Sequence, residues 1–349
     1  MKKLRMVVVG PGLIGKVHIR RIQENPEMQL TGLVAPDHEG NHSVAKSCGV
    51  PLWHDLSACV DASRVDGVVI ASPNEFHFEQ ASQCIEWGIP VLLEKPITPT
   101  LAQGRQLVSL VERKHAKVLI GHHRAHSPLL AKARELIQQG RVGRLVSVMG
   151  SAQFYKPDHY FADGPWRAQM GGGPILINLI HEIGNLRSLM GEILAVQAIS
   201  SSRIRQFPVE DTVAINMVFE NGALGTFLLS DTAASAKSWE LTSQENPSYP
   251  HQPDDACYTI AGTQGSLDIP TMRLKYYPES TAPSWWSPFA EEVIPVERQD
   301  PLECQMRHFG KLIQGKETPL VSAQDGFRNL LVTEAIRESA KTLALVQVA

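Results

Sequence analysis

The first third of the chain alternates short apolar segments with longer amphipathic ones. The apolar segments are rich in β-branched residues, and most are apolar at consecutive positions, which is typical of strands buried on both faces. They predict strands at residues 5–9, 30–35, 67–71, 91–94 and 117–120. Helical periodicity lies between them, at residues 13–24, 41–48, 76–87 and 101–115. This alternation predicts βαβ units that build a parallel sheet.

Beyond Arg124 the pattern changes to strands in succession. A strand at 145–153 leads into an aromatic, turn-rich segment at 154–173 and a helix at 175–190. Further strands are predicted at 195–201, 212–219, 223–229, 239–242, 258–261 and 266–269, and closing helices at 301–314 and 325–345. The pattern favours an α/β domain with a large, mostly antiparallel sheet that is open on one face. We therefore expect domains at residues 1–124 and 125–349.

Capping residues support three of the helix starts. Asn74 and Thr100 are expected to cap the helices at 76–87 and 101–115. Ser127 followed by Pro128 predicts an N-cap and a proline at the first helical position.

Length and composition agree with a globular protein of two domains. The 349 residues exceed the roughly 250 to 300 at which one hydrophobic core usually stops growing. No apolar run approaches the roughly 20 residues needed to cross a bilayer, so no membrane partner is expected. The basic first residues meet Gly10 too soon for a signal peptide.

Cysteine usage and charge narrow the environment and the partners. The five cysteines are widely spaced and include no Cys-x-x-Cys pair, which argues against a disulfide framework or a thiolate metal site and favours the cytoplasm. The net charge of -3 gives no reason to expect a nucleic-acid partner. No carboxylate pair at ligand spacing is apparent, and we expect no metal.

A glycine-rich turn, Gly10-Pro11-Gly12-Leu13-Ile14-Gly15, separates the first predicted strand from the first helix. Gly10 permits a tight turn, Gly12 lets a pyrophosphate approach the backbone, and Gly15 allows close packing of helix on strand. The first helical turn, with Leu13 and Ile14, offers N–H groups to the anion. An ordinary glycine turn is the alternative, but the βαβ context favours a Rossmann dinucleotide-binding domain.

Asp37 follows the second strand and is the candidate for binding the adenosine ribose. The order Ala35-Pro36-Asp37 puts the acid out of the expected register, so turn chemistry is an equal alternative. No Lys or Arg lies between Pro36 and Val44 to meet a 2′-phosphate, which favours NAD, with NADP possible.

Three polar clusters follow the carboxyl ends of predicted parallel strands, where ligands of open α/β sheets bind. Each cluster alone is more typical of a structural role, but together they predict the nicotinamide end of the site. The candidate cofactor-binding residues are Ser72, Pro73, Asn74, His77, Glu94, Lys95 and Arg124, and His122 and His123 lie beside them.

Together with Trp166-Arg167, Gly171-Gly172-Gly173 and the helix that bears His181, these motifs make nearly the whole chain resemble the glucose-fructose oxidoreductase, inositol dehydrogenase and MocA (Gfo/Idh/MocA) family. The resemblance implies a Rossmann domain followed by an α/β domain with a large open sheet. It also implies that Lys95 is the catalytic lysine, that a cis peptide bond precedes Pro96, and that His181 faces the substrate.

The chemistry expected of such a site is the loss of hydride from a carbinol carbon to nicotinamide, with loss of the hydroxyl proton. We assign Lys95 to polarise the oxygen and His181 to accept the proton, because a pKa near 6.5 suits transfer at neutral pH. Without the family context, the residues alone favour a buried structural histidine on an amphipathic helix for His181.

The chain departs from the family pattern beside His181. Many relatives carry an aspartate four residues earlier, where this chain has Ile177, and another three residues later, where it has Gly184. Asn178 lies on roughly the same helical face as His181 and is a candidate to orient the imidazole or the substrate, although it cannot accept a proton. Whether Lys95 or His181 is the base stays open.

The candidate substrate-binding residues are His122, His123, Trp166, Arg167, Asn178 and His181, with Asp231 as a further possibility. Trp166 offers a flat apolar face of the kind on which sugars pack, and Arg167 a donor for a carboxylate or hydroxyls. A structural salt bridge is an equal alternative for Arg167.

The leading hypothesis is an NAD(P)-dependent dehydrogenase acting on a sugar, polyol or related hydroxy compound, its partner being that small molecule. One alternative keeps the cofactor bound, as a glycosidase or a sugar-sugar oxidoreductase; another is a non-enzymatic dinucleotide-binding regulator. The open sheet is expected to expose an apolar face, which predicts a homodimer or homotetramer built on it.

Overall fold

The computed structural model describes residues 3–62 and 64–348, and the chain divides into two units. The first unit comprises the chain up to His126 together with Pro301–Leu330, and the second comprises Ser127–Asp300 and the chain from Leu331 onward. The first crossover lies two residues from the expected boundary at 124, but the chain also returns to the first unit near its end, which a single boundary did not anticipate.

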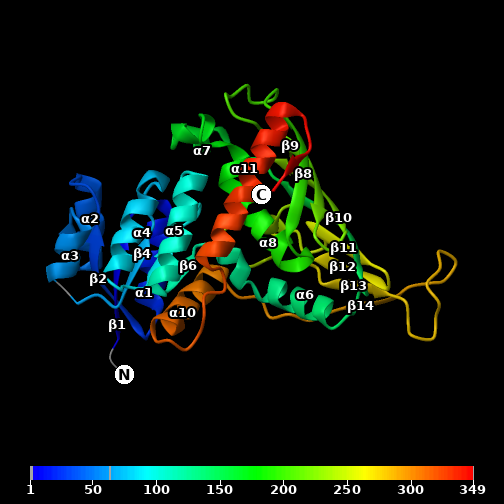
Figure 1. Ribbon diagram of the computed structural model, residues 1–349, viewed down its shortest axis with the longest axis horizontal. Coiled ribbons are helices and arrows are strands. Elements are labelled where there is room, and N and C mark those ends of the chain that lie inside the picture. The colour runs from blue at the N-terminus through cyan, green and yellow to red at the C-terminus, as the bar shows by residue number, and fades with distance from the viewer. Residues whose placement is uncertain (1–2, 63, 349) are drawn as a thin grey trace. The chain divides into compact units, whose positions relative to one another are not determined.

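The first unit is built on a six-stranded parallel sheet in the order β3-β2-β1-β4-β5-β6 (Figure 1). The order reverses between β1 and β4, and this switch point is where ligands of such sheets bind. The strands are β1 (Leu4–Val9), β2 (Met28–Val34), β3 (Leu52–Trp53), β4 (Gly67–Ile70), β5 (Val91–Leu93) and β6 (Val118–Ile120). The five predicted strands are present, and the short β3 was not predicted.

Helices connect these strands and pack on the sheet. They are α1 (Leu13–Glu24), α2 (Glu39–Cys48), α3 (Leu56–Ala62), α4 (His77–Glu86), α5 (Leu101–Lys114), α10 (Pro301–Ile313) and the start of α11 (Ala323–Thr342). Hydrophobic burial explains why the chain returns to this unit. Phe309 and Leu312 of α10 are buried in one core with Met6 of β1 and Ile22 of α1.

Two of the three predicted N-caps are confirmed. The side chain of Thr100 accepts a hydrogen bond from the Gln103 amide at 3.3 Å, and that of Ser127 accepts from the Leu129 amide at 3.1 Å. Asn74 was wrongly expected to cap α4. It opens a 3₁₀ turn, Asn74–Phe76, so the α-helix begins only at His77, with no side-chain cap.

The second unit is built on a nine-stranded sheet in the order β14-β13-β12-β11-β7-β10-β9-β8-β15. Neighbouring strands are antiparallel except β7 and β10, which run parallel. The strands are β7 (Leu145–Gln153), β8 (Ile193–Ser201), β9 (Thr212–Phe219), β10 (Leu224–Ser230), β11 (Tyr258–Gly262), β12 (Gly265–Ile269), β13 (Arg273–Tyr276), β14 (Ala290–Val293) and β15 (Val346–Gln347). The prediction of a large, mostly antiparallel sheet is confirmed.

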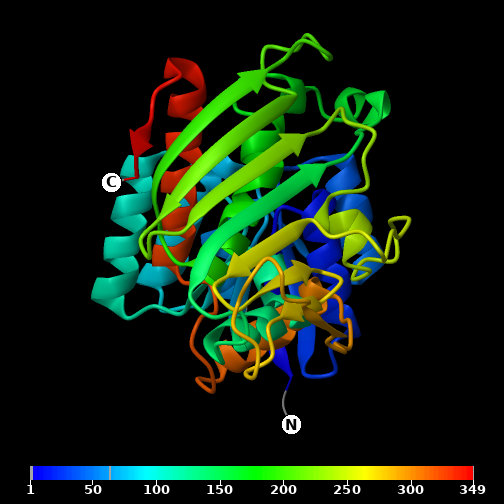
Figure 2. The ribbon, with the colours of Figure 1, turned by 90° about the vertical axis from the view of Figure 1, so that its right-hand side faces the viewer.

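In Figure 2 no helix covers the side of β7, β8, β9 and β10 that faces the viewer, and the helices of the unit lie behind or beside the sheet. They are α6 (Pro128–Gln138), α7 (Asp158–Ala162), α8 (Ile180–Met190), α9 (Trp239–Thr242) and the rest of α11. Residues 239–242 were wrongly predicted as a strand: Ser238 caps a short helix there by accepting from the Leu241 amide. Among the described helices, none has both the length and the apolar character needed to span a membrane.

Candidate active site

The three glycines of the turn between β1 and α1 differ in what an added side chain would meet. Gly10 has a φ of +83°, and a Cβ there would lie 2.7 Å from the backbone of Ser72. A Cβ at Gly15 would lie 2.0 Å from the carbonyl oxygen of Gly10, so the helix approaches the strand only because the side chain is missing. At Gly12 the same atom would meet nothing within 4 Å. The middle glycine therefore faces open space.

The amino end of α1 is suited to an anion. Gly12 is the N-cap, no side chain caps the first turn, and that turn contains no acidic residue. Backbone N–H groups at a helix start lack intrahelical partners and carry the positive end of the helix dipole. The turn therefore fits the pyrophosphate of a dinucleotide, and a Cβ at Gly12 would intrude into the space beside it.

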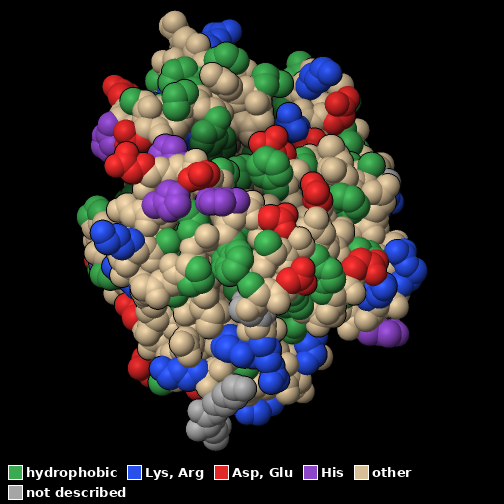
Figure 3. Space-filling view, turned by 90° about the vertical axis from the view of Figure 1, so that its left-hand side faces the viewer, with side chains coloured by type: hydrophobic (Ala, Val, Ile, Leu, Met, Phe, Trp, Pro, Cys, Tyr) green, Lys and Arg blue, Asp and Glu red, His purple; other side chains and the backbone are tan. Residues whose placement is uncertain are grey.

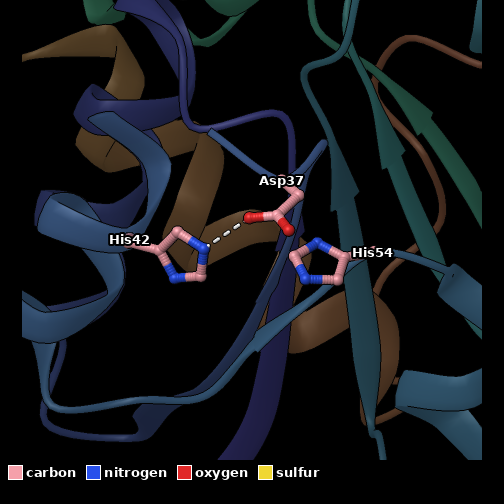
Figure 4. Close-up of side chains that lie close together, drawn as sticks. All are labelled: Asp37, His42 and His54. Atoms are coloured by element: carbon pink, nitrogen blue, oxygen red, sulfur yellow. Dashed lines mark hydrogen bonds and ion pairs between the residues drawn. The ribbon is translucent and has the colours of Figure 1, made fainter. Parts of the chain in front are cut away.

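Asp37 lies beyond the carboxyl end of β2, next to two histidines (Figure 4). Its Oδ1 is 2.7 Å from Nε2 of His42, and His54 follows β3 alongside. This hydrogen bond lowers the pKa of Asp37, and the charge of His54 adds to the effect. Ala35, which directly follows the strand, is buried, and Asp37 is the exposed acid at this edge.

The loops that follow β4 and β5 are joined by His77. Its ring is fully buried, with Nδ1 2.8 Å from the carbonyl oxygen of Pro96 and Nε2 3.0 Å from that of Ser72. Burial lowers the pKa of His77, so the ring is neutral and donates to one of these two carbonyls. The peptide bond between Lys95 and Pro96 is cis, as the resemblance implied. His77 thus fixes the backbone on either side of the site.

Glu94 and Lys95, at the end of β5, form the charged centre of the first unit. Burial alone would raise the pKa of Glu94, but a 2.8 Å hydrogen bond with Nε2 of His18 and the charges of His18 and Lys95 lower it overall. Burial lowers the pKa of Lys95, Glu94 opposes this, and Arg124 adds to it. A lysine with a lowered pKa is a better proton acceptor at neutral pH.

His18 is a site residue that sequence analysis did not select. It lies on α1 one turn after Gly15, and its ring is fully buried against Glu94. The available signal was a polar residue on the otherwise apolar face of that helix.

Further polar residues follow the carboxyl end of β6, in the same sheet as β4 and β5. Arg124 and His122 are buried, and Nε2 of His122 lies 3.3 Å from the amide nitrogen of Asn329. Burial and the adjacent Arg124 charge lower the pKa of His123 to about 3. His123 is therefore neutral at physiological pH.

In the second unit, His181 and Asn178 flank an irregular point of the helix. Residues Ile175–Leu179 form a π-helical turn that runs into α8, and Asn178 lies in that turn while His181, which is buried, lies in the first turn of α8. π-Helical turns interrupt helices frequently at functional sites. Glu182 and Asn185 meet instead at the buried hydroxyl of Tyr258, so they anchor α8 in the core.

Lys156 is a second residue that the sequence analysis missed. Its Nζ donates to Oδ1 of Asn178 at 2.7 Å and lies 3.8 Å from the carboxylate of Asp231, which in turn pairs with Arg205 at 2.8 Å. Lys156 and Asp231 are both buried, and burial raises the pKa of Asp231 against the lowering effect of the two cations. The amine of Lys156 therefore lies beside Asn178, next to position 177, where the family resemblance leads one to expect an aspartate and this chain has Ile177.

Arg167 and Trp166 lie in the 3₁₀ turn Pro165–Ala168, close to aromatic rings. The Arg167 guanidinium lies 4.1 Å from the ring centre of Tyr160 and 5.7 Å from that of Trp166, whose side chain is exposed. Nη1 of Arg167 donates to the carbonyl oxygen of Tyr160, and a stacked guanidinium keeps its other in-plane N–H groups as donors.

Comparison with known proteins identifies both parts of the chain. Residues 4–122 match the oxidoreductase family with an NAD-binding Rossmann fold (GFO/IDH/MocA), and residues 130–268 match the GFO/IDH/MocA C-terminal domain. The chain is 25% identical to the rhizopine catabolism protein MocA of Rhizobium meliloti, over 97% of this chain and 95% of that protein. It is 25% identical to scyllo-inositol 2-dehydrogenase (NAD(+)) of Bacillus subtilis, over 99% and 96%.

Solved structures agree on the architecture. An oxidoreductase from Agrobacterium radiobacter, in complex with NAD+, L-tartaric acid and magnesium, superposes with a TM-score of 0.80 at 18% identity over 99% of both chains. At this identity the likeness establishes the fold.

Proposed function

Because this chain belongs to the GFO/IDH/MocA family of oxidoreductases with an NAD-binding Rossmann fold, we propose that it transfers hydride between NAD and a carbinol carbon of a sugar, polyol or related hydroxy compound. One observation carries the reaction type. Lys95, with its lowered pKa, follows β5 of the same sheet whose β1 leads into the open glycine turn. The named activity of the B. subtilis relative, oxidation of an inositol with NAD, supports the substrate class.

NAD, when bound, supplies the hydride acceptor, and the chain supplies its position and the proton chemistry. The uncapped amides after Gly12 would hold the pyrophosphate and Asp37 the ribose hydroxyls. Ser72, Asn74 and Arg124, with the loops that His77 fixes, would hold the nicotinamide end. The absence of Lys and Arg from residues 36–44 supports NAD over NADP.

Proton transfer is assigned to Lys95 and His181. Lys95 binds the reacting oxygen, and its lowered pKa lets it accept a proton near neutral pH. Because Lys156 engages Oδ1 of Asn178, the amide NH₂ of Asn178 is left as the donor to a substrate oxygen. His122, His123, Trp166 and Arg167 are proposed to line the substrate region.

The proposal is tested by replacing Lys95 and His181 with Ala and measuring turnover against pH with NAD. We expect each variant to lose about 10²- to 10⁴-fold in kcat, as for removal of an acid-base group, with NAD affinity within a few-fold of wild type. The exposed Lys114→Ala is the matched control.

The base is the residue whose removal abolishes the pH dependence near neutrality. Wild-type turnover in both variants would contradict the assignment. Accumulation of NADH, followed by its near-ultraviolet absorbance, distinguishes a dehydrogenase from enzymes that return the hydride to their substrate.

A cytoplasmic location is part of the same proposal. The five cysteines form no disulfide among the residues that the structure describes, which suits a reducing compartment.

A further inference from the structure

Three donor side chains converge at one edge of the first unit, outside the charged centre at Lys95. Asp37 follows β2, His42 lies in the first turn of α2, and His54 follows β3. Because β2 and β3 pair in parallel, with Val34 opposite Trp53, the residues beyond their carboxyl ends meet at the same edge. Figure 4 shows the three side chains directed toward one another, and Figure 3 shows histidines gathered beside acidic groups on this face.

The spacing of the donor atoms fits a bound cation. One ligand atom from each of Asp37, His42 and His54 lies within 4.8 Å of the other two, and the three side chains are accessible to solvent. Histidine nitrogens and carboxylate oxygens bind zinc at about 2.0–2.2 Å, so two donors of one ion lie at most about 4.4 Å apart, which is close to the spacing here. The open side of the cluster leaves room for water as a further ligand.

The orientation of the donors suits the same use. Nδ1 of His54 lies 3.1 Å from the carbonyl oxygen of Ala35, which restrains the ring, and metal-binding histidines commonly have such a backbone partner. His42 is already held against the carboxylate at 2.7 Å.

We propose that Asp37, His42 and His54 form a binding site for a divalent transition-metal ion of the zinc class. Two imidazoles and one carboxylate are the donors that zinc, nickel and copper prefer, whereas magnesium and calcium prefer oxygen donors. The site uses the carboxylate that the proposed function gives to the ribose of NAD, so metal and dinucleotide exclude one another there. A metal ion of this class is therefore an inhibitor that competes with the cofactor.

The sequence contains part of the signal. His38 and His42 are one helical turn apart, a spacing that often binds metal. In the structure, however, His38 is the N-cap of α2 and its Nδ1 accepts from the Gly40 amide at 3.0 Å. The third donor, His54, joins Asp37 and His42 only because β3 pairs with β2.

The test is a calorimetric titration of the metal-free chain with zinc chloride, without cofactor or substrate. We expect one site whose affinity falls by on the order of tenfold or more in His42→Ala and in His54→Ala, and further in the double variant. His38→Asn is the matched control, because it removes a neighbouring imidazole while retaining a good N-cap. Unfolding temperatures measured without metal verify that each variant is folded.

The proposal is overturned if the wild-type chain binds no zinc, or if the double variant binds it as tightly as wild type. A second titration measures NAD affinity with and without zinc. Weakening by zinc in wild type but not in the double variant supports the competition, and an unchanged affinity overturns it. The zinc titration requires no NAD binding and no turnover, so failure of the metal site and failure of the proposed function are distinguishable.

Discussion

At the scale of single residues, the chemistry of the first unit depends on how a few buried charged groups shift one another's pKa values. Lys95 is pulled toward the neutral amine by burial and by Arg124, and toward the ammonium form by Glu94. Glu94 stays ionised although buried because His18 donates to it and positive charge surrounds it. The pKa of Lys95, one of the two candidate bases, therefore depends on Glu94 and, through Glu94, on His18.

Replacing Glu94 with Gln tests this directly. The amide keeps an acceptor for His18 but removes the charge that favours protonated Lys95, so the pKa of Lys95 falls further. For alcohol oxidation, kcat/KM rises with pH as the base loses its proton, and this limb is expected to move to lower pH by about one unit. A pH profile of kcat/KM measures the shift.

The control for this change is Glu112→Gln, which removes the same charge from the exposed surface of α5. Its profile is expected to match wild type. A limb that stays in place or moves to higher pH in Glu94→Gln would show that Lys95 is not the group titrating in the profile.

The residues that sequence analysis missed share a physical property. His18 and Lys156 acquire their roles from partners 76 and 22 positions away, Glu94 and Asn178, and no local pattern pairs them. The glycines of the turn, in contrast, can be recognised from the sequence because their requirement is local: a strand, a bend and a helix start within six residues. Lys95 and His181 were selected from the family resemblance.

At the scale of elements, two glycines of the turn between β1 and α1 have different roles: Gly15 is needed for packing, and Gly12 for binding. Gly15→Ala would place a methyl 2.0 Å from the Gly10 carbonyl, so helix and strand must move apart, while Gly12→Ala meets open space. We expect Gly15→Ala to lower the free energy of unfolding by about 1–3 kcal/mol or more, as overpacking does. Gly12→Ala should instead leave stability within about 0.5 kcal/mol and weaken NAD binding.

Denaturant unfolding and an NAD titration of both variants provide the measurements. The two substitutions add the same methyl group at neighbouring positions, so each is the control for the other. Equal loss of stability in both would contradict the geometry of the turn, and undiminished NAD affinity in Gly12→Ala would contradict its role at the pyrophosphate.

Element prediction succeeded where a segment carries its own periodicity and failed where tertiary context decides. The consecutive apolar strands of the first unit and the long strands of the second were predicted, because the order of apolar residues within each segment reveals burial on both faces or on alternate residues. Residues 239–242 have an apolar, β-prone composition but form a helix under the Ser238 cap. The short β3 and β15, of two residues each, exist only through pairing with a longer neighbour.

At the scale of the whole molecule, the unexpected feature is that a late segment, Pro301–Leu330, returns to the first unit before the chain ends in the second. The amphipathic pattern of α10 was correctly interpreted as a helix, but periodicity does not reveal which core its apolar face joins. Phe309 and Met306 of α10 fill the space against Met6 and Met28. A fragment that ends before Pro301 would therefore lack part of the first unit's core.

The bare face of the nine-stranded sheet is the other feature at this scale, and it supports the proposal of a homo-oligomer. Ile199, Leu228 and Met149 project from β8, β10 and β7 on alternate positions and are 65%, 39% and 63% exposed. Ile199 is opposite Ala214 of β9, and Ala214 is opposite Leu228, so these three form a continuous apolar row, while Met149 is opposite Thr226 in a neighbouring row. Apolar patches of this kind usually mark an interface.

A second copy of the same chain is the proposed occupant, and a charge on this row should prevent its binding. Ile199→Glu is expected to convert a dimer or tetramer to monomer in sedimentation velocity at micromolar concentration, because burying an unpaired carboxylate costs more than the interface gains. Ile204→Glu makes the same change five residues away, in the turn that follows β8, where the side chain is 71% exposed and outside the sheet. It should leave the oligomer intact. A wild-type chain that sediments only as monomer, or an Ile199→Glu variant that assembles as wild type does, would rule out the sheet face as the interface. Retained NAD binding in both variants would show that the first unit is unaffected.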